Sequence, residues 1–227
     1  MKTVWVLWGL WPETTSKFYM DLINFYCQKN PWNRPPILIW NIPMSNNIES
    51  KFLLTWEWID KYLSYLVEWA KILEKWWVDF IVIPCNSIHY LIDDIRKSIS
   101  IPIISIIDET INYIVNKKLS NIWIISSLFT SKSKIYENQF IKNKIDFIWL
   151  NNDEQRTIDN IILNLVSGDY TQNDKLLIIN IINKLKERWA KNILLACTDL
   201  QILVNSMSEV PIYDTMNILT HSTINNM

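Results

Sequence analysis

The chain has 227 residues, of which 49% are hydrophobic and 20% charged, a balance typical of a globular protein and not of a disordered one. Its net charge of −1 gives no electrostatic attraction for nucleic acid or for an anionic membrane surface, so we expect neither partner. Apolar runs fall short of the roughly 18 residues that span a bilayer, and the amino terminus does not read as a signal peptide, which predicts a cytoplasmic protein.

Short apolar runs alternate with amphipathic segments along the whole chain. Runs typical of buried strands lie at 3–8, 36–40, 79–84, 101–107, 121–127, 145–150, 192–196 and 210–214. Segments with helical periodicity lie at 13–29, 57–75, 86–98, 108–118, 131–143, twice within 153–188, and at 199–207 and 215–224. This alternation predicts an α/β fold of parallel strands joined by crossover helices.

The two halves of the chain resemble each other. "TVWVL" matches "NIWII", "LIWN" matches "FIWLN", and a Cys follows a buried strand in each half, at Cys85 and Cys197. We expect two similar lobes related by pseudo-two-fold symmetry, each a mostly parallel sheet flanked by helices, formed by 1–105 plus 211–227 and by 106–210. Two such lobes are expected to hold one ligand in the cleft between them, at the carboxyl ends of the strands.

Thirteen Trp and only two Gly are an unusual balance. Trp189, for example, follows the basic end of a predicted helix, where Gly commonly takes a left-handed conformation. The many Ile, Asn and Lys residues are typical of an AT-rich gene, and some bacteria with such genes read UGA as Gly. We hypothesise that most of these Trp are Gly in the native protein. UGG codons at Trp5, Trp8, Trp77 and Trp189 would refute the hypothesis.

Cys85 and Cys197 lie between a buried strand and a helical segment. Amides and the dipole at a helix start lower the pKa of a thiol, and Asn86, Ser87 or Thr198 could cap the helix and hold a substrate carboxylate. Two matched thiols suit the inversion of a stereocentre, because one removes the α-proton from one face while the other delivers a proton to the opposite face. Nothing in the sequence indicates a cofactor site, and we expect no cofactor.

These segments resemble the cofactor-independent aspartate/glutamate racemase family. "VLWGLWPETT" is similar to that family's Gly-rich first loop, with Trp8 and Trp11 at Gly positions, while "IPCNSIH" resembles its PCN[TS]-x-H motif and "ACTDL" its GCTE motif. The resemblance implies a homodimeric amino-acid racemase, independent of PLP, with Cys85 and Cys197 as the acid/base pair. It also implies a substrate site drawn from Asn86, Ser87, Thr198, Ser127, Thr130 and Asn47.

Departures from the family pattern bear on the substrate. The aspartate racemase branch fits better than the glutamate branch, because the Asp-Ser opening loop of glutamate racemases is missing. That branch often carries an Arg where this chain has Asn46 and Asn47, and a Lys where it has Val166. An acidic side chain thus lacks its counter-charges, which favours a neutral or broader amino-acid specificity.

Other interpretations stay open. His89, four residues after Cys85, could polarise that thiol or could be a structural His. Cys85, His89 and Cys197 could bind zinc, but the chain has no Cys-x-x-Cys pair, and we expect no metal. A non-catalytic two-lobed protein that binds a small ligand, or a one-thiol isomerase or decarboxylase, would also fit the alternating pattern.

Overall fold

The structure is a computed structural model that describes residues 1–8, 12–43, 57–76, 78–204 and 208–227. The chain divides into two compact units, one formed by Met1–Glu109 with Met216–Met227 and the other by Thr110–Thr215. The lobes predicted from the sequence were 1–105 plus 211–227 and 106–210. The structure assigns residues 106–109 to the first unit and residues 211–215 to the second, where a strand within 211–215 pairs with the strand that precedes Cys197.

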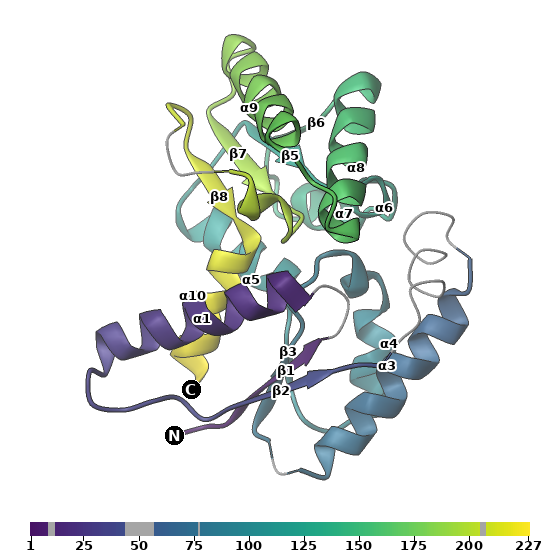
Figure 1. Cartoon of the computed structure of the whole chain (residues 1–227), viewed down its shortest axis with the longest axis vertical. Helices are drawn as coiled ribbons and strands as arrows, with labels where there is room; N and C mark the ends of the chain where they lie inside the picture. Colours follow the sequence, from purple (N-terminus) through teal and green to yellow (C-terminus); the bar gives the residue numbers. More distant parts are fainter. Residues whose placement is uncertain (9–11, 44–56, 77, 205–207) are drawn as a thin grey trace. The chain divides into compact units, whose positions relative to one another are not determined.

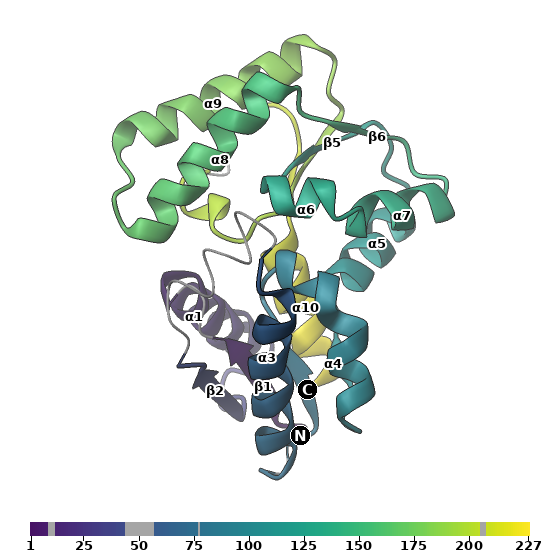
Figure 2. The same cartoon turned by 90° about the vertical axis from the view of Figure 1, so that its right-hand side faces the viewer.

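The first unit contains a four-stranded parallel sheet. Its strands are β1 (Val4–Trp8), β2 (Ile37–Asn41), β3 (Phe80–Val82) and β4 (Ile103–Ile104), in the order β2-β1-β3-β4. The described helical segments are α1 (Pro12–Lys29), α3 (Ile59–Glu74), η2 (Ser87–Leu91), α4 (Ile92–Ser98), α5 (Ile106–Asn116), of which only the first turn belongs here, and α10 (Thr215–Asn226). Figures 1 and 2 show α1 and α10 on one face of the sheet and α3 and α4 on the other.

The second unit repeats this arrangement. Its strands are β5 (Ile122–Ile125), β6 (Phe147–Trp149), β7 (Asn192–Leu195) and β8 (Ile212–Asp214), parallel and in the order β6-β5-β7-β8. Its further helical segments are α6 (Leu128–Lys132), α7 (Ile135–Lys142), α8 (Asn152–Ser167), α9 (Gln172–Glu187) and η3 (Leu200–Ile202). The two sheets share one strand order, as the paired sequence motifs predict, and the predicted α/β fold is confirmed.

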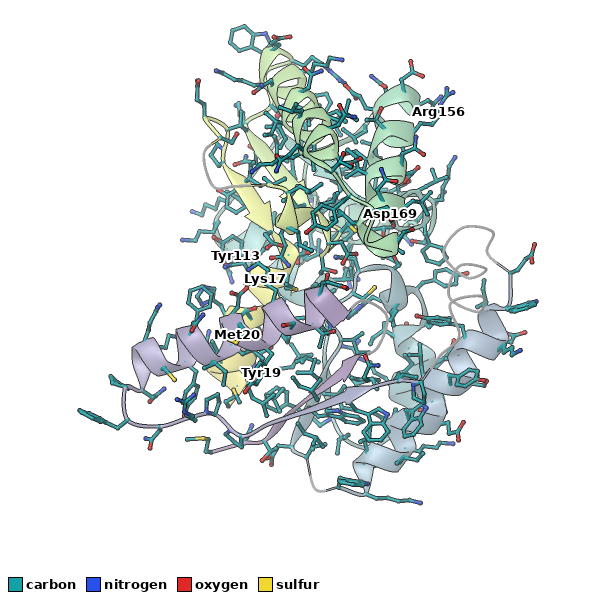
Figure 3. All side chains as sticks on the ribbon, in the orientation of Figure 1. Lys17, Tyr19, Met20, Tyr113, Arg156 and Asp169 are labelled. Atoms are coloured by element: carbon teal, nitrogen blue, oxygen red, sulfur yellow. The ribbon has the colours of Figure 1, made fainter. Side chains whose placement is uncertain are left out.

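One core of the second unit lies between its sheet and the helix pair α8 and α9. The side chains that point from β5 and β7 into this core are Trp123, Ile125, Ile193 and Leu195, all of them buried. The helices add one Ile or Leu about every turn, so the apolar stripes of α8 and α9 face the sheet. The opposite side of α8 is solvated: Arg156 points outward (Figure 3).

The helices differ from the sequence expectations in two places. The segment predicted as one helix at 131–143 is two helices, α6 and α7, because Lys134 takes a left-handed conformation with φ 58° and interrupts the ladder. The helix predicted at 199–207 is only the short 3₁₀ turn η3 within the described residues, and 205–207 lie outside them. Among the described residues, no helix has the length and hydropathy needed to cross a bilayer.

Several Trp side chains sit where an indole is poorly accommodated. Trp58 and Trp189 have left-handed backbones, with φ 58° and 63°. Trp5, Trp40 and Trp123 bury an indole N–H that finds no acceptor among the described residues. A buried polar group without a partner costs about 1–3 kcal/mol. Gly would relieve the backbone cost at Trp58 and Trp189.

Candidate active site

The strand order determines where each unit can bind a ligand. In the first sheet the chain passes from β1 to β2 on one side and then crosses to β3 on the other side of β1. In the second sheet it passes from β5 to β6 and then crosses to β7. The direction of strand addition therefore reverses at β1 and at β5. In open parallel sheets, ligands bind outside the carboxyl ends of the strands at such a reversal. β3 pairs directly with β1, and β7 pairs directly with β5. Cys85 follows β3, and Cys197 follows β7.

Cys85 is buried in the turn between β3 and η2. Its amide donates to the oxygen of Ile83 at 2.8 Å, which closes a tight turn at the end of the strand. Asn86 and Ser87 follow it and are also buried. Asn86 is the N-cap of η2 but makes no side-chain capping bond, contrary to its predicted capping role. A 3₁₀ segment, and not an α-helix, begins after this thiol.

His89 is fixed by two backbone groups. Its Nε2 accepts from the amide of Ile106 at 3.1 Å, so Nε2 carries no hydrogen, and Nδ1 donates to the main-chain oxygen of Cys85 at 2.7 Å. Burial lowers the pKa of His89 to about 4, although the bond to Cys85 and the charge of Asp108 oppose this shift. The imidazole is therefore neutral at pH 7, and both nitrogens are occupied. The sequence-based hypothesis that His89 polarises the thiol is replaced by a role on the backbone.

Cys197 is half-buried and lies one residue beyond Ala196, whose amide donates to the oxygen of Ile125 in the neighbouring strand at 2.8 Å. Its Sγ lies 3.8 Å from Oδ2 of Asp199, a contact in which the thiol donates to the carboxylate. Asp199 and Thr198 are both buried. A carboxylate beside a thiol can receive its proton, which suits a group that alternates between thiol and thiolate.

The loop after β5 also lies at this carboxyl edge. Ser127 is the N-cap of α6: its Oγ accepts from the amide of Thr130 at 3.2 Å and donates to Thr130 Oγ1 at 3.1 Å. Thr130 is fully buried, whereas Ser127 is partly exposed. Of the two predicted substrate hydroxyls, Ser127 is the one with exposed surface, and Thr130 holds it in place.

Two residues of α8 brace this loop, and the sequence analysis assigned them no role. Gln155 Nε2 donates to the oxygen of Ser126 at 2.9 Å and to Asp159 Oδ1 at 3.0 Å. Asp159 accepts from the amide of Leu128 at 2.9 Å, and partial burial raises the pKa of this carboxyl. Their spacing of four residues on one helix face is the signal from which the pair could have been found.

Some predicted positions lie outside the described residues, and two buried polar residues near the site were not predicted. Asn47, Trp11 and the Gly9 loop lie outside the described residues. Thr14 and Thr15, by contrast, are buried polar residues in the first turns of α1, directly beyond β1, and the sequence analysis overlooked them. Each unit thus brings one Cys together with buried hydroxyl or amide side chains at one edge of its sheet.

Comparison with known proteins agrees with this architecture. The family profile of Asp/Glu/hydantoin racemases matches residues 7–223. The broad specificity amino-acid racemase RacX of Bacillus subtilis (strain 168) is 28% identical to this chain over 225 residues, which cover 96% of this chain and 95% of that protein.

Solved structures show the same fold. Picrophilus torridus aspartate racemase superposes with a TM-score of 0.83 at 22% identity, over 100% of this chain and 94% of that one. An aspartate racemase homologue from Pyrococcus horikoshii OT3 gives 0.81 at 23%, over 100% and 99%. Aquifex pyrophilus glutamate racemase gives 0.65 at 18%, over 99% and 84%. At these identities the likeness establishes the fold alone.

Proposed function

This chain belongs to the Asp/Glu/hydantoin racemase family, and from that premise we propose that it racemises free amino acids with two thiols. The observation that carries the proposal is the placement of Cys85 and Cys197 at matching points of two repeated sheets. Each follows the strand beside the reversal point, among buried polar side chains. A protein that only binds its ligand has no need for a matched pair of thiols.

The proposed reaction balances as a pair of proton transfers at one α-carbon. A thiolate at one Cys removes the α-proton and becomes a thiol, while the thiol at the other Cys protonates the opposite face and becomes a thiolate. The reverse reaction exchanges the two roles. After one turnover the new thiol must release a proton to water and the new thiolate must take one up from water; Asp199, in contact with the Cys197 sulfur, would relay the proton at that site. No cofactor enters this scheme.

Polar groups beside each thiol are proposed to hold the substrate. Asn86, Ser87 and Thr198 would bind the α-carboxylate and ammonium through side chains and amides, with the exposed edge of Ser127 nearby. Thr130 is buried behind Ser127, and its part is to support it. Asn47 would contact the substrate's side chain, where its neutral amide selects against acidic amino acids.

We propose a neutral or broad substrate range on this basis. The related Bacillus subtilis protein carries the name of a broad specificity racemase, which agrees with the absence of Arg or Lys at positions 46, 47 and 166. Homodimer formation and a cytoplasmic location complete the proposal. Sedimentation of the purified protein tests the first of these, since a monomer at micromolar concentration would contradict it.

The experiment that tests the activity is α-proton exchange in deuterated water, followed by proton NMR. The panel contains L- and D-alanine, serine, lysine, arginine and aspartate, and the variants are Cys85→Ser and Cys197→Ser, with Cys27→Ser as the control. We expect exchange and racemisation in the wild type and control, and loss of racemisation in both site variants. Activity that survives aminooxyacetate, which captures PLP, supports independence from that cofactor.

Three outcomes would contradict the proposal. Binding of an amino acid without any exchange would identify a non-catalytic binding protein. Retained activity in one of the two site variants would identify a one-thiol isomerase. Full loss of activity on aminooxyacetate treatment would show that PLP does the chemistry.

A further inference from the structure

His89 joins the turn that carries Cys85 to the start of another helix. Nδ1 donates to the carbonyl of Cys85, and Nε2 accepts from Ile106, the first residue of α5. Because Nε2 must be unprotonated to accept from an amide, the ring is held as the neutral tautomer with its hydrogen on Nδ1. The ring is 4% exposed, so water does not compete for either bond.

We propose that His89 is a positioning residue for Cys85: it fixes the main-chain oxygen of Cys85 against the amino terminus of α5 and thereby sets the direction of the thiol. This inference rests on the proposed two-thiol racemase. The turn between β3 and η2 spans residues 83–86, and within it the amide of Cys85 donates to the oxygen of Ile83. The bond to His89 supplies the second fixed point, at the carbonyl.

The far end of this link is itself anchored. Arg96 Nη2 donates to the oxygen of Ile103 at 3.0 Å and to Asp108 Oδ2 at 3.1 Å, which ties α4 to the β4–α5 connection. Ser105 Oγ accepts from the amide of Asp108 at 3.1 Å and caps α5. His89 therefore connects the Cys85 turn to a rigid helix start and not to a loose loop.

The second unit uses different groups at the equivalent place. Gln201, four residues after Cys197 as His89 is four after Cys85, donates to the oxygen of Thr198 at 2.8 Å. Thr215, at the start of α10, donates from Oγ1 to the oxygen of Leu195 at 3.0 Å. The link from the helix start thus ends two residues short of Cys197, on the strand. Loss of His89 should therefore affect one thiol and leave the other unchanged.

A defect at one thiol has a signature that general destabilisation lacks. The two enantiomers have equal free energy, so the equilibrium constant is 1 and kcat/KM must be the same in both directions. A defect at one thiol therefore cannot make the two kcat/KM values differ. It appears in isotope effects. When proton transfer at Cys85 slows, α-deuteration slows the reaction of the enantiomer from which Cys85 removes the proton. The reaction of the other enantiomer is then limited by proton delivery from Cys85, so it shows a solvent isotope effect instead.

The test compares His89→Gln and His89→Asn, with His221→Asn as the control at the other His of the chain. An Asn amide places a donor at the position of Nδ1, and a Gln amide places an acceptor at the position of Nε2. We expect His89→Gln to lower kcat roughly 10- to 100-fold, as for a catalytic group displaced by about 1 Å. The α-deuterium effects of the two enantiomers should diverge in this variant. His89→Asn keeps the donor to Cys85 but loses the bond to Ile106, so it should show a smaller loss of kcat with the same divergence of the isotope effects.

The substrate is the fastest amino acid of the exchange panel, used as its α-deuterated L and D forms. Equal loss in both directions without divergence of the isotope effects, or wild-type behaviour in His89→Gln, would overturn the inference. If His89→Gln does not fold, His89→Asn decides: a loss with diverging isotope effects supports the inference, and wild-type behaviour or a symmetric loss opposes it. A wild-type protein that exchanges no α-proton would instead refute the proposed racemase.

Discussion

The end of α9 offers the sharpest test of the Trp positions. Trp189 N–H donates to Lys186 at 2.9 Å, and Ala190 N–H donates to Leu185 at 3.1 Å, the pair of bonds that closes a Schellman motif. Trp189 has φ 63°, and its side chain is 86% exposed, so the indole contributes little packing. Replacing Trp189 with Gly should therefore change mainly the backbone energy.

The expected gain is about 1 kcal/mol. A non-Gly residue in the left-handed region costs about 1–2 kcal/mol, and Gly returns about 0.4–1 kcal/mol of this through the greater entropy of the unfolded chain. For a chain of this size, 1 kcal/mol raises Tm by about 2–4 °C. Urea unfolding followed by fluorescence and circular dichroism, together with a thermal melt, measures the difference between Trp189→Gly and the parent chain.

The chain supplies its own controls. α8 ends in the same pair of bonds around Gly168, at φ 74°, and a Cβ added there would meet nothing within 4 Å, so Gly168→Trp should lose about 1 kcal/mol by the same reasoning. Lys118 and Lys144 occupy left-handed positions, and their replacement by Gly should stabilise as Trp189→Gly does. Trp32→Gly alters an exposed Trp that lacks a positive φ and should give no gain. A loss on Trp189→Gly would refute the reasoning.

Three further predictions concern charged and polar groups. Glu154→Gln should lower the free energy of unfolding in urea by about 1–3 kcal/mol, because the buried Glu154 carboxylate bonds Arg188 at 2.6 Å. Arg156→Gln breaks an exposed ion pair with Asp153 and should change this free energy by less than about 0.5 kcal/mol. Equal effects of the two substitutions would contradict the prediction. Burial lowers the pKa of His89 from 6.5 to about 4, so the unfolded chain binds the proton more readily than the folded one. The neutral His89 therefore adds about 3 kcal/mol to the free energy of unfolding above pH 6.5, and this stability is lost as the pH falls to 4. Unfolding titrations across that range should show a steeper acid loss in the wild type than in His89→Asn, and parallel curves would oppose the assignment. Asp159→Leu removes the acceptor at the start of α6 and should lower kcat roughly tenfold, while Asp159→Asn, which keeps an acceptor, should not; equal kcat values in the two variants would argue against the brace.

The sequence predicted the fold well, because the pattern that carries it is local and repeated. The eight apolar runs became the eight described strands, and the paired motifs around Cys85 and Cys197 matched one strand order used twice. The turns were harder to predict. Lys134 breaks a helix by its backbone angle, which nothing in its side chain announces.

The candidate site could be predicted in outline only. Cys85 and Cys197 follow their strands as expected, because a strand end is visible in the sequence. The role of His89 depends on Ile106, 17 residues further along the chain, and that of Asp159 depends on the amide of Leu128 at the start of α6. Residue type and spacing can place Gln155 and Asp159 on one helix face, but they do not show which backbone group a side chain will bond. For the same reason the sequence left open whether His89 acts on the thiol or is structural.

The central claim is that two thiols reach one carbon from its two faces, and early deuterium incorporation tests it most directly. The wild-type protein is given one unlabelled enantiomer in deuterated water, and the reaction is stopped at a few per cent conversion. The account predicts that the product enantiomer carries deuterium at the α-carbon while the recovered starting enantiomer still carries protium. Product that retains protium, or equal labelling of both enantiomers from the outset, would mean that a single base serves both faces.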